Sequence, residues 1–159
     1  MNLLFKYRVV LSGFMVGLLL SGLTAFPLTW ELNLLVSWLT PYRESWPGLY
    51  DWMARVREGL VHNDANYPFI AYGTDWLAFA HIMIAGAYIG PWRDPVRNRF
   101  ILEWGMVCCL AVFPLAFIFG PIRGIPMAWT LIDCAFGVVG FPPLWLCWKW
   151  SKQMEAETI

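Results

Sequence analysis

Charged side chains are scarce in this sequence, since only 14% of its 159 residues are Asp, Glu, Lys or Arg. Ordinary soluble domains carry about 25%. The 11 basic and 11 acidic residues give a formal net charge of zero, and they form neither a basic tract nor an acidic tail. Because nucleic-acid binding needs a concentrated positive surface, we predict that the protein binds no nucleic acid.

Paired cysteines are missing too. None of the four cysteines belongs to a C-x-x-C pair, and none lies among loop residues where an oxidising compartment would bridge it. The four-helix thiol oxidoreductases of membranes, such as the quinone-reducing enzymes and the vitamin K epoxide reductases, depend on that pair, which argues against this class of enzyme. We interpret the cysteines as small apolar side chains. They are Cys108, Cys109, Cys134 and Cys147.

The sequence also lacks the common metal, cofactor and catalytic motifs. It contains no H-E-x-x-H or clustered Cys and His spacing for zinc, no phosphate-binding loop and no G-x-S-x-G. Of its two histidines, His62 lies outside the apolar stretches, which disfavours a bis-histidine haem site, while a His–Met pair stays formally open. We therefore predict no metal site and no cofactor, and whether the protein is an enzyme stays open.

Apolar residues, in contrast, make up 59% of the chain, above the share of about 45–50% in soluble domains. A bilayer core about 30 Å thick needs roughly 20 mainly apolar residues per helix. Gly90-Pro91 and Gly120-Pro121 predict the ends of two such helices, and Pro126 predicts the start of another. We predict an all-α fold, an integral membrane four-helix bundle that forms a single domain over residues 1–159. Its spans cover about residues 9–28, 72–90, 100–120 and 127–148.

Positive charges are concentrated on one side of the predicted spans. Seven Lys and Arg residues flank the spans closely on the side of both termini, against four on the other side. This distribution predicts that the N- and C-termini lie in the cytoplasm. Cleavage of the first span as a signal peptide is disfavoured, because Leu23 would occupy a position that needs a small residue. The seven are Lys6, Arg8, Arg93, Arg97, Arg99, Lys149 and Lys152, and the four are Arg43, Arg55, Arg57 and Arg123.

Residues 29–71 form an outer segment between the first two predicted spans. Pro41 and Pro47 break any helix there. The stretch LYDWMARVREGL that follows has apolar residues at helical spacing and charged residues between them, which predicts an amphipathic helix lying in the membrane interface. A lid over a pocket between the spans stays an alternative for the same helix. Its apolar residues are Leu49, Trp52, Met53, Val56 and Leu60.

Four ionisable residues lie within or beside the apolar stretches, where charges are costly: Asp75, His81, Arg123 and Asp133. At about 1.5 Å per helical residue, His81 would lie roughly 13 Å and Asp133 about 9 Å below the outer surface. Both also lie on stripes of small residues, which favour close packing with other helices. We predict that the four residues converge in the outer half of the bundle, with His81 near Asp133 and Asp75 near Arg123.

Such a cluster is either a set of structural pairs or a functional site, and the sequence leaves both open. As a functional site, Asp75, His81, Arg123 and Asp133 would bind a ligand. If a reaction is catalysed, His81 would transfer a proton, Asp133 would orient His81, and Arg123 would hold an anionic headgroup.

Four strings within residues 72–137 stand out: YGTDWLAFAH, IGPWRDPVRN, GPIRGIP and LIDCAFG. They resemble segments of a group of small bacterial four-helix inner-membrane proteins to which no activity is assigned. The resemblance implies a location in the bacterial inner membrane, and it transfers no catalytic or binding residue.

Two interpretations of function remain. In the first, the protein binds a lipid or an amphipathic small molecule in a polar intramembrane cluster that opens to the periplasm. In the second, it is an accessory or structural subunit of a larger membrane complex, and the cluster only stabilises the bundle. The expected partners are membrane lipids, together with a membrane-protein partner or further copies of the chain.

Overall fold

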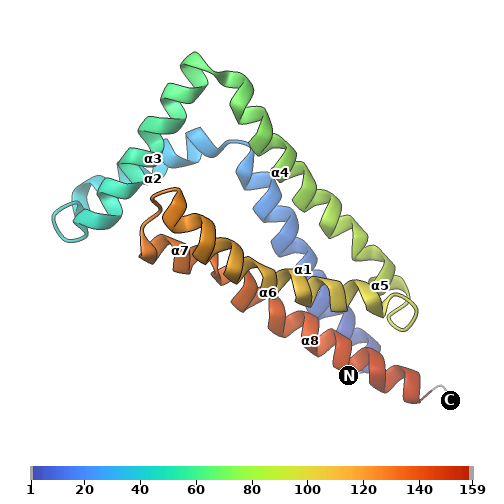
Figure 1. The fold of residues 1–159 in the computed structure, drawn as a ribbon. Coiled ribbons are helices and arrows are strands. Elements are labelled where there is room, and N and C mark those ends of the chain that lie inside the picture. Colours follow the sequence, from blue (N-terminus) through green and yellow to red (C-terminus); the bar gives the residue numbers. More distant parts are fainter. Residues whose placement is uncertain (1, 158–159) are drawn as a thin grey trace. The chain divides into compact units, whose positions relative to one another are not determined.

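The computed structural model describes residues 2–157. This part of the chain contains helices and no strand, and the fold is 87% helical, which confirms the predicted all-α class. Figure 1 shows the elements in chain order. They are α1 (Leu3–Ala25), α2 (Leu28–Leu39), the short 3₁₀ helix η1 (Thr40–Tyr42), α3 (Pro47–Asn66), α4 (Pro68–Ala87), α5 (Ile89–Arg93), α6 (Arg99–Ile122), α7 (Met127–Asp133) and α8 (Ala135–Ala156).

Four helical stretches in the described residues are long and apolar enough to cross a bilayer. Each of them contains most of one predicted span. These helices indicate a multi-pass membrane protein. The four stretches are Leu3–Ala25, Pro68–Arg93, Arg99–Ile122 and Met127–Ala156.

The helix ends differ from the predicted ones at both Gly-Pro pairs. Helical structure continues through Gly90-Pro91 as far as Arg93, and α6 continues past Gly120-Pro121 to Ile122. The predicted ends were therefore wrong by less than one helical turn. Pro91 is accommodated because it lies in the first turn of α5, where backbone N–H groups have no intrahelical acceptor.

The chain divides into two compact units. The terminal unit consists of Met1–Gly17 and Ala85–Ile159, and the central unit consists of Leu18–Ile84. Helices α1 and α4 each contribute residues to both units.

In the terminal unit, α6 and α8 pack closely at glycines. A Cβ added at Gly137 would meet the backbone carbonyl of Cys109 and the ring of Phe113, and one added at Gly140 would meet the Cys109 sulfur. Both glycines lie on the predicted small-residue stripe of the fourth span, and α6 occupies the space that they leave. The fully buried side chains of this unit include Tyr7, Leu11, Leu102, Leu144 and Cys147.

Buried hydroxyl groups hold the turn between α5 and α6 against the rest of the terminal unit. The Tyr7 hydroxyl donates to the carbonyl of Pro91 at 3.0 Å, and the Ser151 hydroxyl donates to the carbonyl of Pro95 at 2.8 Å. The two bonds provide hydrogen-bond donors for a carbonyl near the end of α5 and for a carbonyl in the turn that follows.

Arg99, at the start of α6, connects α6 to α8. Its Nη1 lies 2.6 Å from Glu155 Oε2, and its Nε lies 3.9 Å from Glu103 Oε1. The indole N–H of Trp148 donates to the same Glu103 oxygen at 2.9 Å. Charged residues that flank two spans in the sequence therefore join those spans in the fold.

In the central unit, α3 packs against α2. Leu32 and Val36 of α2 and Met53 of α3 are buried, and the Arg57 Nε donates to Asn33 Oδ1 at 2.5 Å. The stretch predicted to be an amphipathic helix lies within α3, where Met53 is buried and the other apolar residues of the stretch are half-buried. Its place in the membrane interface stays a prediction. Its charged residues Asp51, Arg55, Arg57 and Glu58 are exposed.

The C-terminal part of α1 approaches α4 closely within the same unit. A Cβ added at Gly22 would lie 2.7 Å from the Ala78 carbonyl oxygen and 3.0 Å from the Cβ of His81. Ala78 is fully buried. The absence of a side chain at Gly22 therefore sets the distance between these two helices.

Candidate functional site

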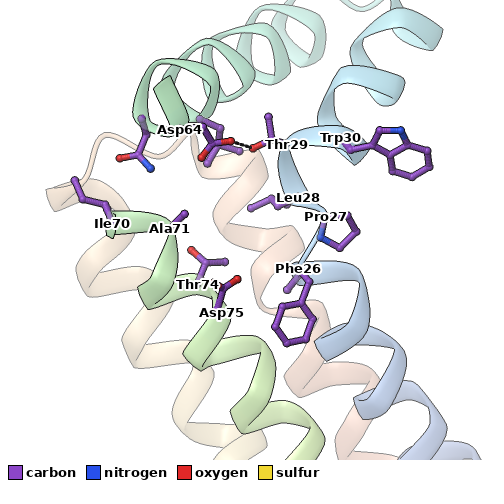
Figure 2. A pocket seen from close by; sticks show the side chains of 13 residues that line it. Phe26, Pro27, Leu28, Thr29, Trp30, Asp64, Ile70, Ala71, Thr74 and Asp75 are labelled. Carbon is purple, nitrogen blue, oxygen red and sulfur yellow. Dashed lines mark hydrogen bonds between the residues drawn. The ribbon is translucent and has the colours of Figure 1, made fainter. Parts of the chain in front are cut away.

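A pocket of about 330 Å³ lies in the central unit, where α1 ends, α2 and α4 begin and α3 ends (Figure 2). Its walls therefore come from four helices and from the bend at Phe26 and Pro27. All of its lining residues belong to the central unit. They are Ala25, Phe26, Pro27, Leu28, Thr29, Trp30, Leu60, Asn63, Asp64, Ile70, Ala71, Thr74 and Asp75.

Two prolines create the helix breaks that surround the pocket. Pro27 has no backbone N–H and separates α1 from α2, and Pro68 begins α4 directly after Tyr67, the residue that ends α3. Proline suits the first position of a helix, because the N–H that it lacks would have no intrahelical acceptor there. The chain therefore changes direction at both sites, and the ends of four helices enclose a space.

The polar part of the pocket is rich in hydrogen-bond acceptors. The Thr29 hydroxyl donates to Asp64 Oδ2 at 2.7 Å, which joins α2 to the end of α3 (Figure 2). Asn63 and Thr74 add further polar groups. Asp75 is half-buried, and its carboxylate makes no hydrogen bond or ion pair within the described residues of the central unit.

No Lys, Arg or His lines the pocket, although two carboxylates do. The pocket therefore carries negative charge. Nor does any Ser, Cys or Lys nucleophile lie beside a histidine there. This set of side chains can bind a hydrogen-bond donor or a positively charged group.

An apolar groove of about 290 Å³ adjoins the pocket and shares Phe26 and Asp75 with it. Its other walls are the rings of Tyr72, Trp76 and Phe79 on α4. Tyr72 stacks edge-to-face with Trp76 at a centroid distance of 6.0 Å, and Trp76 stacks in the same way with Phe79, also at 6.0 Å. Asp75 thus lies between a pocket with polar and apolar walls and an aromatic groove.

Of the four predicted site residues, Asp75 is the one that lines this pocket. His81 lies further along α4, with its Cβ beside Gly22. The His81 Nδ1 is 2.8 Å from the carbonyl oxygen of Leu77, and since a carbonyl only accepts, Nδ1 carries the proton. The Nε2 atom of a neutral His81 is then an acceptor.

Arg123 and Asp133 lie in the terminal unit. Arg123 follows α6 in an exposed turn, where Gly124 takes the positive φ of 68° that glycine tolerates. Asp133 is the last residue of α7 and is exposed. Neither makes an ion pair within the described residues of its unit. Because Asp75 and His81 belong to the central unit, the convergence of all four residues stays a prediction.

Sequence reasoning missed Thr29, Asn63 and Asp64 as site residues. All three lie in the outer segment, which the sequence marks only as polar and amphipathic. The available signal was the run HNDAN at residues 62–66, which places several polar side chains directly before Pro68 and the second span.

Within residues 2–157, no group of three or more His, Cys, Asp or Glu side chains is close enough to hold a metal ion. Comparisons with protein-family models, with curated proteins and with solved structures give no match to this chain. The geometry of the pocket is therefore the basis for assigning a function.

Proposed function

We propose that the protein is a small multi-pass membrane protein that binds a lipid or another amphipathic small molecule in the pocket of the central unit. The observation that carries this proposal is the junction at Asp75, where a pocket with a polar part and an apolar groove share two residues. An amphipathic molecule has a polar head and an apolar tail, and the two compartments match these parts. The pocket alone is within the usual size range of ligand sites, about 300–1,000 Å³.

The proposed site lies beside the start of an apolar helix. Asp75 is in the second turn of α4, whose stretch Pro68–Arg93 is long enough to cross a bilayer. A ligand that entered the groove from the lipid would thus bring its head to the level where Thr74 and Asp75 line the pocket. This arrangement favours a ligand that is dissolved in the membrane over one that arrives from water.

The proposed location is the bacterial inner membrane, with both termini in the cytoplasm and the pocket in the periplasmic half. The excess of Lys and Arg beside the termini supports this orientation, and the resemblance to small bacterial membrane proteins supports the type of membrane. Reporter fusions after Glu157 and within the segment between Tyr42 and Pro47 test it. A reporter active only in the cytoplasm should work in the first fusion and fail in the second.

His81, Arg123 and Asp133 are proposed as further ligand-binding residues that act if the two units bring them toward Asp75. His81 supports this extension, because the Leu77 carbonyl oxygen occupies its Nδ1, and its Nε2 makes no hydrogen bond within the described residues of the central unit. In the same extension, His81 and Asp133 are the candidates for any proton transfer.

The second candidate function is that of an accessory subunit in a larger membrane complex or a homo-oligomer. Three exposed tryptophans of the outer segment favour it: Trp30, Trp38 and Trp46 are each more than 60% exposed. Exposed tryptophans are common in contacts between proteins. Purification in a mild detergent separates the candidates, since a stoichiometric partner supports a subunit and a monomer opposes it.

A bulky substitution inside the pocket tests the ligand-binding proposal. Ala71 lines the pocket and is half-buried, so Ala71→Trp fills the space, while Ala65→Trp places the same bulk at an exposed site of α3 outside it. We expect saturable binding of a fluorescent lysophospholipid to wild-type protein in nanodiscs, beyond that to empty nanodiscs. Ala71→Trp should weaken it by roughly tenfold or more, a cost of about 1.4 kcal/mol, and Ala65→Trp should not. Equal binding by both variants contradicts the proposal.

A further inference from the structure

We infer that the polar head of the ligand is an organic cation, an alkylammonium or quaternary ammonium group, which lies in the pocket at Asp75, where the carboxylate balances its charge, and which meets the aromatic rings where the pocket joins the groove. This inference rests on the proposed function and adds the chemical class of the ligand. It comes from three features of the central unit: the charge of the pocket, the free carboxylate and the ring geometry.

The charge of the pocket selects the sign of the head group. Asp64 and Asp75 are its ionisable residues, and no cationic side chain lines it. An anionic head such as a sulfate or a free phosphate monoester would meet two negative charges, and no positively charged side chain of the lining would offset the repulsion. A cationic head meets two counter-charges.

Asp75 is the carboxylate that lacks a partner. It is half-buried beside Phe26 and makes no hydrogen bond or ion pair within the described residues of its unit. A charge placed beside apolar surface is costly unless a counter-charge or donors compensate it. Asp64 differs, because one of its oxygens already accepts a hydrogen bond from Thr29. Asp75 is therefore the main binding residue for the cation, and Asp64 adds long-range attraction.

The aromatic rings supply the second element of cation recognition. Organic cations are attracted to the faces of Trp, Tyr and Phe within about 6 Å of the ring centroid. Trp76 contacts Tyr72 and Phe79 edge-to-face, so one ring face is covered in each pair. The three side chains are still 47–61% exposed, which leaves ring surface for a cation. An aromatic belt at a membrane surface explains such rings by themselves. It does not explain a partnerless carboxylate beside them on the same helix.

The two features adjoin, because Asp75 and Trp76 are neighbours on α4 and Asp75 lines both the pocket and the groove. The groove wall is wholly apolar, so the carboxylate belongs to the pocket side and the rings to the groove side. A tetraalkylammonium head has no N–H donor, so it relies on Asp75 for charge and on the rings for contact. A primary ammonium head additionally donates hydrogen bonds to the carboxylates. In both cases the alkyl chain continues along the groove.

Three amphiphiles with the same octyl chain test the inference: octyltrimethylammonium, octyl sulfate and octyl glucoside. Binding of each to the full-length protein in nanodiscs of neutral lipid is measured by calorimetry, with empty nanodiscs as the blank. We expect saturable binding of the cation at least roughly tenfold tighter than binding of either other amphiphile. A preference for octyl sulfate, or equal affinity for all three, overturns the inference.

Substitutions separate the role of charge from that of shape. Asp75→Asn keeps the size of the side chain and should weaken binding of octyltrimethylammonium by roughly tenfold, with little change for octyl glucoside. Asp51→Asn is the control, since it removes the same charge at an exposed site of α3 outside the pocket. Equal effects of the two substitutions would indicate a general surface potential and contradict a specific site.

The aromatic wall is tested in the same way by Trp76→Leu and by the control Trp38→Leu. Trp76 and Trp38 are 56% and 68% exposed, so both variants should fold, and only Trp76 lines the groove. We expect Trp76→Leu to weaken binding of the cation several-fold and Trp38→Leu to leave it unchanged.

The outcomes also separate this inference from the proposed function. If all three amphiphiles bind saturably with equal affinity and Ala71→Trp abolishes this binding, the pocket is a ligand site and the preference for a cation is wrong. If none of them binds above the blank and the lysophospholipid does not bind, both proposals are wrong.

Discussion

Thr29 and Asp64 share a hydrogen bond of 2.7 Å across the rim of the pocket, although 35 positions separate them in the chain. The bond joins the first turn of α2 to the last turn of α3 (Figure 2). It therefore fixes two of the four helix ends that enclose the proposed binding site.

Removing this bond should loosen the end of α3. We expect Thr29→Val, which keeps the shape of the side chain, to increase amide hydrogen exchange of residues 60–66 and to cost about 0.5–1.5 kcal/mol of local stability. Ser37→Ala is the control, because the Ser37 hydroxyl donates to Leu34 in its own helix. Similar exchange in both variants would show that the bond does not hold α3.

The contact between α1 and α4 should depend on Gly22. A Cβ at this position would lie 2.7 Å from the Ala78 carbonyl oxygen, so Gly22→Ala should push the helices apart and destabilise the central unit by about 1–3 kcal/mol. At Gly17, on the same helix, nothing lies within 4 Å of an added Cβ. Gly17→Ala should therefore be neutral or stabilising by up to about 1 kcal/mol, because alanine favours a helix. Unfolding in a mixed-micelle denaturant titration measures both, and an equal response would contradict the close contact.

The ion pair of Arg99 with Glu155 should contribute modestly to the terminal unit. The Glu155 side chain is 42% exposed, so we expect Glu155→Gln to lower the free energy of unfolding only slightly. The loss should shrink at about 1 M salt, where charges are screened. Glu157→Gln, at an exposed residue two positions further on, should have no effect. The comparison needs only thermal unfolding at two salt concentrations.

The predicted approach of His81 to Asp133 is testable by cross-linking. In a variant without the four native cysteines, we expect cysteines at positions 81 and 133 to form a disulfide in the membrane. Cysteines at 83 and 133 should not, because Met83 lies about 200° around the axis of α4 from His81. Failure of the first pair, or equal cross-linking of both, would remove Arg123 and Asp133 from the proposed site.

The predictable part of this structure is the part that depends on local pattern. Long apolar runs predicted the four helices that are long enough to cross a membrane, and the alternation of apolar and charged residues around Met53 predicted α3. Asp75 was recognised because a carboxylate in an apolar run is unusual in any fold. These inferences needed no knowledge of which helices are neighbours.

The pocket was not predictable, because it depends on contacts between distant residues. Asp64 looks like an ordinary exposed polar residue until Thr29 is seen to bond to it. The bends at Pro27 and Pro68 are visible in the sequence, yet their angles decide that four helix ends meet. His81 and Asp133 belong to different units, and the expected depth of each along its helix says nothing about its packing partners.

Photolabelling tests the central claim most directly, because it reports where a membrane-dissolved amphiphile contacts the protein. An octylammonium probe with a diazirine in its chain is activated in nanodiscs with and without excess octyltrimethylammonium, and the labelled peptides are identified by mass spectrometry. We predict adducts that the competitor removes within residues 25–30 and 70–79. Labelling spread evenly over the exposed face of α6, unchanged by the competitor, would contradict a binding site at Asp75.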